Sequence, residues 1–197
     1  MSHFDTRAKT WDSGDTRVNG AQTIANAIKE KITLKEDMEI IDFGVGTGLL
    51  GFIIAEDVKK VYGVDTSTQM LIKLEEKNTP ELNIEAIHQD IIQNPLTQTV
   101  HGLVSSMTLH HVEDLKAFFD TIYQNIHEEG FIAIADLESE DGTFHSDNTG
   151  VFHFGFEDKE LCSIVEKSGF KNVQFENINV INKPHKDFGI FLLTATK

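Results

Sequence analysis

Cysteine and arginine are scarce in this 197-residue chain, which contains one cysteine and two arginines. Because Cys162 has no second cysteine to pair with, an intrachain disulfide and a zinc site built on cysteines are excluded, and a reducing, cytoplasmic compartment is expected. The longest apolar run, residues 49–55, is far shorter than the ~18 residues that a membrane span needs. Residues 1–12 are polar and charged, unlike a secretory signal. We therefore expect no membrane partner.

Positive charge is scarce as well. The chain has 17 lysines and arginines against 32 aspartates and glutamates, which gives a formal net charge of −15 at pH 7. Such a surface repels the phosphate backbone, and no run of basic residues interrupts it, so no nucleic-acid partner is expected. The acidity favours solubility and mutual repulsion of monomers, and nothing in the sequence indicates an oligomeric state.

The chain has the length of one domain, and its apolar residues follow an alternating strand and helix pattern. Strands are expected at 38–43, 58–64, 82–87, 102–107, 131–137, 172–181 and 188–195. Helices are expected around 18–28, over 49–57, around 70–74, from 112 through 126 and around 161–168. This alternation predicts an α/β fold with a largely parallel sheet and helices on both faces.

The last two strands break the alternation, because only residues 182–187 separate them. A connection that short requires an antiparallel hairpin. The final strand is continuously apolar and is expected inside the sheet, whereas its predecessor alternates, shifts phase near Asn177 as in a bulge, and is expected at the edge. The alternating strand 82–87 is expected at the opposite edge.

Residues 40–50 turn sharply from a strand into a helix through Gly44, Gly46 and Gly48. Glycines at such a turn let a ligand approach bare backbone and the N–H groups of the helix. Gly46, Gly48 and Gly51 satisfy the pattern G-x-G-x-x-G, and Asp65 follows where a dinucleotide enzyme holds ribose. One interpretation is therefore a nicotinamide-dependent oxidoreductase.

The register of the loop favours another ligand. In the dinucleotide register Asp42 and Gly44 remain unexplained, and a carboxylate at the end of the strand would repel the phosphates. A ligand with a free ammonium would instead gain from Asp42, while Asp65 would accept the ribose hydroxyls.

The segment 42–48, Asp-Phe-Gly-Val-Gly-Thr-Gly, resembles motif I of the class I S-adenosylmethionine-dependent methyltransferases. Five further segments resemble motifs of that family in the same order along the chain; they are 4–12, 64–70, 89–91, 105–112 and 169–170. Of these, the opening segment 4–12 resembles the quinone-biosynthesis-like small-molecule group of the family. The resemblance implies one domain over 1–197 with a seven-stranded Rossmann-like sheet in the order 3-2-1-4-5-7-6, mostly parallel with a reversed last strand.

The resemblance also implies roles in binding S-adenosylmethionine. The backbone of the three loop glycines would line the methionine part, with Asp42 near its amino group. Asp65 would hold the ribose and Asp90 the adenine amino group, unless Asp90 only caps a turn.

The other expected cofactor residues are Met70 and Ile91 on the adenine ring, with Thr66 and Ser106 from the matching motifs. Trp11 would cover the cofactor within an N-terminal flap and helix (1–32), and Arg17 would pair with its carboxylate; surface packing and a plain ion pair are the alternatives.

Methyl transfer from a sulfonium needs alignment, exclusion of water and in some cases a base. The end of the fourth strand lacks the N-P-P-Y motif that is typical of enzymes acting on planar amines. His110 and His111 follow that strand, and either a general base or a helix-capping, packed histidine fits them.

The irregular stretch 138–156 is expected on the substrate side of the sheet. Phe144, His145, Phe152 and His153 would enclose a small-molecule acceptor there, unless the phenylalanines only anchor the loop. The histidine spacing fits no standard metal site, so no metal is expected. The sequence thus predicts a methyltransferase, with an oxidoreductase or a non-catalytic cofactor-binding protein as alternatives.

Overall fold

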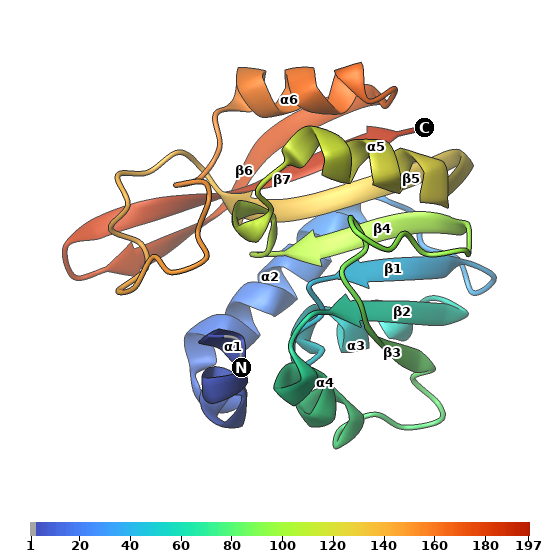
Figure 1. Ribbon diagram of the computed structural model, residues 1–197, viewed down its shortest axis with the longest axis horizontal. Coiled ribbons are helices and arrows are strands. Elements are labelled where there is room, and N and C mark those ends of the chain that lie inside the picture. Colours follow the sequence, from blue (N-terminus) through green and yellow to red (C-terminus); the bar gives the residue numbers. More distant parts are fainter. Residues whose placement is uncertain (1–2) are drawn as a thin grey trace.

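The computed structural model describes residues 3–197, and over this range seven strands form one sheet in the order β3-β2-β1-β4-β5-β7-β6 (Figure 1). The strands are β1 (Glu39–Phe43), β2 (Lys60–Asp65), β3 (Ile84–His88), β4 (Val100–Ser106), β5 (Ile126–Leu137), β6 (Lys171–Lys183) and β7 (Lys186–Thr196). The first five run parallel, and β7 is antiparallel to both β5 and β6. The predicted fold class, strand order and reversed last strand are confirmed.

Helices cover both faces of the sheet because neighbouring strand residues point to opposite sides. Ile41 of β1 belongs to the apolar cluster beneath α5 (Leu115–Asn125) and α6 (Asp158–Lys167). Ile40 belongs to the cluster beneath α2 (Asp15–Lys31), α3 (Leu49–Ala55) and α4 (Thr68–Glu75). Figure 1 shows these two layers above and below the sheet. Within residues 3–197, no helix combines the length and apolarity needed to cross a bilayer.

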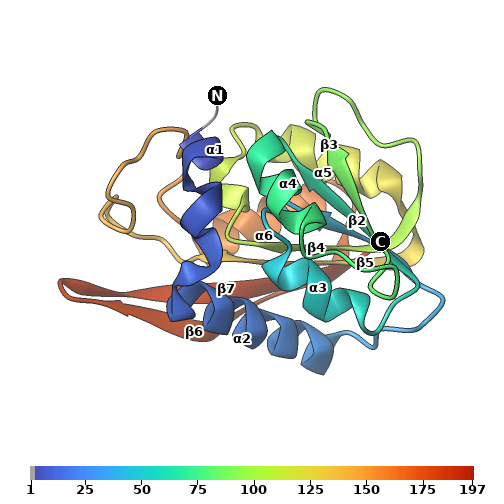
Figure 2. The same cartoon turned by 90° about the horizontal axis from the view of Figure 1, so that it is seen from below.

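The terminal hairpin follows the expected pattern but is longer. Asn182 pairs with Asp187 and Lys183 with Lys186, so only Pro184 and His185 form the turn. The expected bulge is present as a register shift between Asn177 and Asn179. The hairpin tip, the 138–156 loop and α1 (His3–Arg7) lie at the same end of the molecule (Figure 2).

The predicted helix from 112 through 126 is too long at both ends. It begins at Leu115, where the Asp114 side chain accepts a hydrogen bond from the Ala117 N–H, and ends at Asn125. Ile126 already pairs with Val100 as the first residue of β5. The spacing of Ile126 from the apolar residues of α5 wrongly predicts that it belongs to the helix, because Ile126 is buried as a residue of the strand.

Candidate active site

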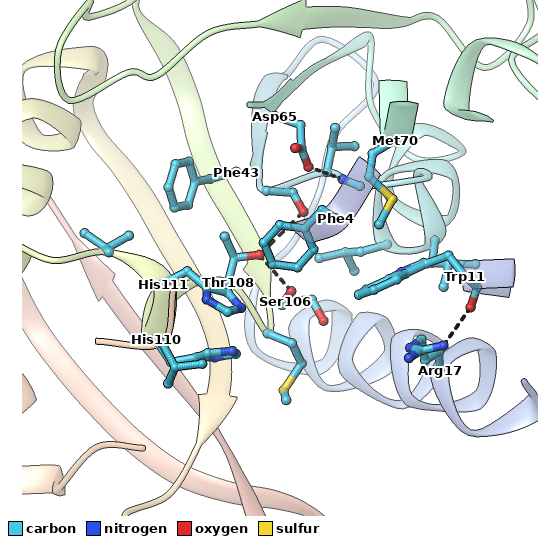
Figure 3. Close-up of a pocket in the computed structure, with 18 of the residues that line it drawn as sticks. Phe4, Trp11, Arg17, Phe43, Asp65, Met70, Ser106, Thr108, His110 and His111 are labelled. Carbon is cyan, nitrogen blue, oxygen red and sulfur yellow. Dashed lines mark hydrogen bonds between the residues drawn. The ribbon is translucent and has the colours of Figure 1, made fainter. Parts of the chain in front are cut away.

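A cavity of about 920 Å³ opens at the carboxyl ends of the parallel strands (Figure 3). Its walls come from the ends of β1, β2 and β4, from the N-terminal segment, from the 138–156 loop and from β6. A cavity of this size is large enough for a cofactor and a small second ligand. The edge of the sheet at which the sequence predicts ligand binding is therefore hollow.

The glycine loop forms the floor of this cavity with Gly44 and Gly46, both at positive φ (69° and 54°). A Cβ on Gly44 would lie 2.2 Å from the Thr108 side chain, so the loop packs tightly there. A Cβ on Gly46 would meet no atom closer than the Gly44 carbonyl oxygen at 4.0 Å, so bare backbone faces open space. Gly48 differs from the expectation: it is the N-cap of α3 beside Phe52 and does not line the cavity.

Asp65, at the end of β2, ties this loop to the next. One carboxyl oxygen accepts a hydrogen bond from the Gly46 N–H (2.8 Å) and the other from the Ser67 N–H (2.7 Å), as Figure 3 shows in part. Burial raises the pKa of Asp65, and these backbone N–H groups oppose the rise. Each oxygen keeps a further lone pair, so the carboxylate can still accept hydroxyl groups from the cavity it lines.

Asp42, near the end of β1, is a buried acid without full hydrogen bonding. It is 1% exposed and lines the cavity, and its Oδ2 has no hydrogen-bond partner among residues 3–197. Burial and the charge of Asp65 raise the pKa of Asp42 to about 8, while a hydrogen bond from the Gly51 backbone N–H acts to lower it. An uncompensated buried carboxyl is costly, which makes Asp42 a natural partner for a cation.

The expected adenine residues are only partly brought together. Met70, Thr66 and Asp90 line the cavity. The Asp90 carboxylate also accepts the backbone N–H groups of Ile92 (3.0 Å) and Gln93 (3.3 Å), which is the predicted capping alternative. That turn directs Ile91 into the apolar core, where it is 1% exposed, and Ile92 takes its place in the cavity wall.

The N-terminal segment lies over the cavity and is tied to both strand-end loops. Asp12, in the 3₁₀ helix η1 (Ala8–Ser13), accepts a hydrogen bond from the Thr47 hydroxyl and pairs with Lys77, both at 2.6 Å. Asp5 accepts the Ser67 hydroxyl at 2.7 Å and the Gln69 N–H at 3.3 Å. We name residues 4–17 the N-terminal cover.

Trp11 and Arg17 lie side by side in this cover (Figure 3). The Arg17 guanidinium lies 4.3 Å from the Trp11 ring centroid and donates to the Trp11 carbonyl oxygen at 3.1 Å. Burial and the charge of Arg7 lower the pKa of Arg17, while Asp12 opposes them. Both side chains line the cavity, as does Ser106 at the end of β4.

The two histidines after β4 have different surroundings. His110, in η2 (Leu109–His111), is 1% exposed; its Nδ1 lies 2.7 Å from Asp136 Oδ1 and its Nε2 lies 3.2 Å from His145 Nε2. Burial lowers the pKa of His110, but Asp136 outweighs it and raises the value overall. His111 donates from Nδ1 to the Gly150 carbonyl oxygen at 2.7 Å and packs edge-on against Phe4.

The 138–156 loop supplies the remaining wall. Phe144, His145 and Phe152 line the cavity as expected. His153 does not: its Nε2 donates to the Val112 carbonyl oxygen at 2.9 Å, which anchors the loop to the protein. The backbone N–H of Phe152 also donates to the His110 carbonyl oxygen at 3.0 Å. Residues 3–197 contain no group of three His, Cys, Asp or Glu residues placed to hold a metal ion.

Sequence reasoning missed three residues of the site, Asp136, Thr108 and Lys183. Asp136 had a signal, because it is the single acid within the otherwise apolar strand 131–137. An acid in a fully buried strand requires a partner, and His110 is that partner. Thr108 and Lys183 carry no such signal.

Part of the chain is similar to a known protein family. A family model described as a methyltransferase domain matches residues 40–130, which include the glycine loop, Asp65 and the two histidines. The match covers a little less than half of the chain, and together with the fold it supports the resemblance to the class I S-adenosylmethionine-dependent methyltransferases.

Two sequence relatives are likewise named methyltransferases. An uncharacterized methyltransferase of Schizosaccharomyces pombe is 29% identical over 167 residues, which are 76% of this chain and 57% of the relative. The chain therefore spans little more than half of that protein. An uncharacterized methyltransferase of Bacillus cytotoxicus is 27% identical over 196 residues, which are 89% of this chain and 91% of the relative.

Solved structures share the fold. The DhpI–SAH complex has a TM-score of 0.77 at 16% identity, covering 98% of this chain and 92% of that one. Phosphoethanolamine N-methyltransferase 2 of Haemonchus contortus, in complex with phosphomonomethylethanolamine and S-adenosylhomocysteine, has a TM-score of 0.77 at 17% identity, covering 98% and 58%. At these identities the similarity establishes the fold alone.

Proposed function

We propose that this protein transfers a methyl group from S-adenosylmethionine to a small-molecule acceptor within the described cavity. One observation carries the proposal: Asp42, Asp65 and the bare backbone at Gly46 line the same cavity as three histidines, His110, His111 and His145. When bound, S-adenosylmethionine supplies an electrophilic methyl group on a sulfonium. The protein then has to bind both ligands, align them and exclude water.

The chemistry of the donor set fits this cofactor. Asp42 would attract its ammonium, because the orphaned Oδ2 gains a charged partner. Asp65 would accept the ribose hydroxyls, and Gly46 leaves room for the methionine chain. Met70 and Ile92 would enclose the adenine ring, with Asp90 and Thr66 at its edge. Arg17 and Trp11 would cover the carboxylate end, and Ser106 would lie between the two ligands.

The dinucleotide alternative fits less well. Asp42 and Asp65 are close enough for the charge of one to raise the pKa of the other. A pyrophosphate beside these two acids would be repelled, whereas an ammonium is attracted. The acceptor would lie between His110, His145, Phe144 and Phe152, all of which line the same cavity.

We further propose that residues 1–197 act as one methyltransferase domain, with 1–32 covering the cofactor and 138–156 covering the acceptor. The single cysteine supports a cytoplasmic location. The acidic surface supports an acceptor that is neither nucleic acid nor membrane lipid.

Calorimetric titration with S-adenosylhomocysteine tests the proposal. The expected result is binding by the wild type and a loss of about tenfold or more in affinity for Asp65→Ala, because two ribose hydrogen bonds disappear. Asp120→Ala, an exposed acid on α5 paired with Lys116, is the control and should bind normally. No binding at millimolar ligand, or binding of NADH instead, rejects the proposal. Binding without turnover on any of a panel of small acceptors supports the non-catalytic alternative.

A further inference from the structure

Three side chains from separate segments form one hydrogen-bonded chain that ends in the cavity. Asp136 lies near the end of β5, His110 lies in η2 and His145 lies in the 138–156 loop. Asp136 is 0% exposed and accepts from the His110 backbone N–H (3.1 Å) and the Leu137 N–H (2.7 Å) in addition to the His110 ring. This carboxylate therefore fixes the His110 ring with Nδ1–H directed at Asp136.

The hydrogen bond between the two rings holds a single proton, which is bonded to one of the two Nε2 atoms. His110 Nε2 and His145 Nε2 lie 3.2 Å apart, so one nitrogen donates and the other accepts. If His110 is neutral, its Nδ1 carries the proton and its Nε2 accepts from His145. If His110 is charged, it donates through Nε2, and the proton of neutral His145 moves to Nδ1. The tautomer of His145 is thus coupled to the charge of His110.

The atom at the cavity end of this chain is Nδ1 of His145, which has no hydrogen-bond partner among residues 3–197. Both His110 nitrogens are engaged, although that ring also lines the cavity. The Nδ1 of His111 is engaged by Gly150. Within the chain of Asp136, His110 and His145, the nitrogen left for an acceptor is therefore Nδ1 of His145, a residue that lines the cavity.

We propose that Asp136, His110 and His145 form a proton relay that deprotonates the methyl acceptor, with His145 as the catalytic base and the other two as positioning residues. The inference rests on the proposed methyl transfer. The acceptor is then a protic group, a hydroxyl or an ammonium. The acceptor's electron pair forms the bond to the methyl carbon, the carbon–sulfur bond breaks and its electron pair stays on sulfur. The acceptor's proton moves to His145 Nδ1, and the proton on His145 Nε2 moves to His110 Nε2.

The charges around the two rings favour this direction of transfer. Asp136 and Glu140 raise the pKa of His110 against its burial. Burial, with the charges of His110, His111 and Lys183, lowers the pKa of His145 to about 4, and Asp136 opposes them. A proton that enters the pair is therefore favoured on His110, beside the carboxylate, while His145 stays neutral.

Nitrogen NMR of the protein with ¹⁵N-labelled histidine, in the presence of S-adenosylhomocysteine, tests the relay. His110→Gln and His145→Gln assign the two rings. The expected result is that His145 changes from the Nδ1–H to the Nε2–H tautomer at the pH where His110 loses its charge. In Asp136→Asn both changes should move to lower pH by about one unit or more, because the carboxylate no longer stabilises the cation. Asp141→Asn, an exposed acid of the same loop paired with Lys186, is the control and should leave both unchanged.

If His145 keeps a single tautomer throughout the titration of His110, the relay is overturned. This outcome is read from the wild-type protein, so the test holds even if Asp136→Asn does not fold. The tautomer change without S-adenosylhomocysteine binding would instead reject the proposed function. Turnover with catechol, which has only hydroxyl groups, and with phenylethylamine, which has only an ammonium, distinguishes a hydroxyl from an ammonium acceptor. With either probe, His145→Gln should lower kcat by about tenfold or more with an unchanged KM for S-adenosylmethionine. Equal kcat values in the two proteins contradict the assignment.

Discussion

Asp42 combines three properties: complete burial, a carboxyl oxygen without a hydrogen-bond partner within residues 3–197, and a second acid nearby. Its pKa of about 8 means that most Asp42 side chains are protonated at pH 7 before a ligand binds. Burial is the first cause, because a charge loses its hydration there. A cation that enters the site reverses this balance and favours the carboxylate.

Binding of S-adenosylhomocysteine should therefore release a proton. Its ammonium lowers the pKa of Asp42, so at pH 7 about one proton leaves for each ligand bound. Affinity should accordingly increase as the pH rises from 5 toward about 8 and level off above that value. Calorimetry in phosphate and in Tris, whose ionisation enthalpies differ, measures the released proton. Asp42→Asn is the comparison, and equal proton release by this variant would contradict the assignment to Asp42.

The element that presents this ligand site is the loop between β1 and α3, in which Gly44 and Gly46 have different roles. At Gly44 a larger residue has no room, because a Cβ would lie 2.2 Å from the Thr108 side chain. At Gly46 a Cβ would clash with no neighbouring atom, but it would project into the cavity and take up space that a ligand needs. Substitution by alanine separates the two.

Gly44→Ala should lower the free energy of unfolding by about 2–5 kcal/mol, since both the positive φ and the clash with Thr108 oppose it. Gly46→Ala should cost only the ~1–2 kcal/mol of its positive φ but lose most affinity for S-adenosylhomocysteine. Gly150→Ala, at φ 76° with no atom within 4 Å of the added Cβ, measures the cost of the dihedral alone. Urea unfolding and calorimetry check both effects. Normal ligand affinity in Gly46→Ala would show that the ligand does not approach this backbone.

Asp12 holds the N-terminal cover to the same loop through the Thr47 hydroxyl, and to the segment after α4 through Lys77. The Lys77 pair is about one-third exposed on both sides, so it contributes up to ~1 kcal/mol. Asp12→Asn should therefore accelerate dissociation of S-adenosylhomocysteine by about 2- to 5-fold. Trp11 is the only tryptophan, so stopped-flow fluorescence reports the cover directly. Asp120→Asn, on α5 and outside the cover, is the control, and equal rates in all three proteins would mean that the cover does not limit release.

Elements were more predictable than side-chain directions. The alternation of strands and helices and the short 182–187 connection determine the sheet, because each depends on local pattern. Ile91 and Ile92 are equally apolar neighbours, and only the turn capped by Asp90 decides which one faces the cavity. His145 and His153 likewise look alike in sequence, yet one lines the cavity and the other binds the Val112 carbonyl. Such choices depend on tertiary contacts, which local spacing does not contain.

At the scale of the whole molecule, the net charge of −15 acts on any charged ligand that approaches. The cavity adds to it, because its wall contains six acids against three basic side chains. The acids are Asp42, Asp65, Asp90, Glu113, Asp114 and Asp147, and the bases are Arg7, Arg17 and Lys183. S-adenosylmethionine carries a sulfonium and an ammonium against one carboxylate and is a net cation. S-adenosylhomocysteine lacks the sulfonium and is neutral overall. The field of the protein therefore favours the cofactor over the product.

Salt should remove this preference. Raising the ionic strength from about 0.01 to 0.1 M shortens the Debye length from about 30 to 10 Å, which screens most of the distant acids. The Kd of S-adenosylmethionine should then rise by about 2- to 5-fold, while that of S-adenosylhomocysteine changes little. Calorimetry at the two salt concentrations measures both values. Because the effect is summed over the whole surface, Asp42→Asn should weaken binding and yet keep the same salt dependence. If that one substitution abolished the salt dependence, the preference would come from a single contact rather than from the field of the whole molecule.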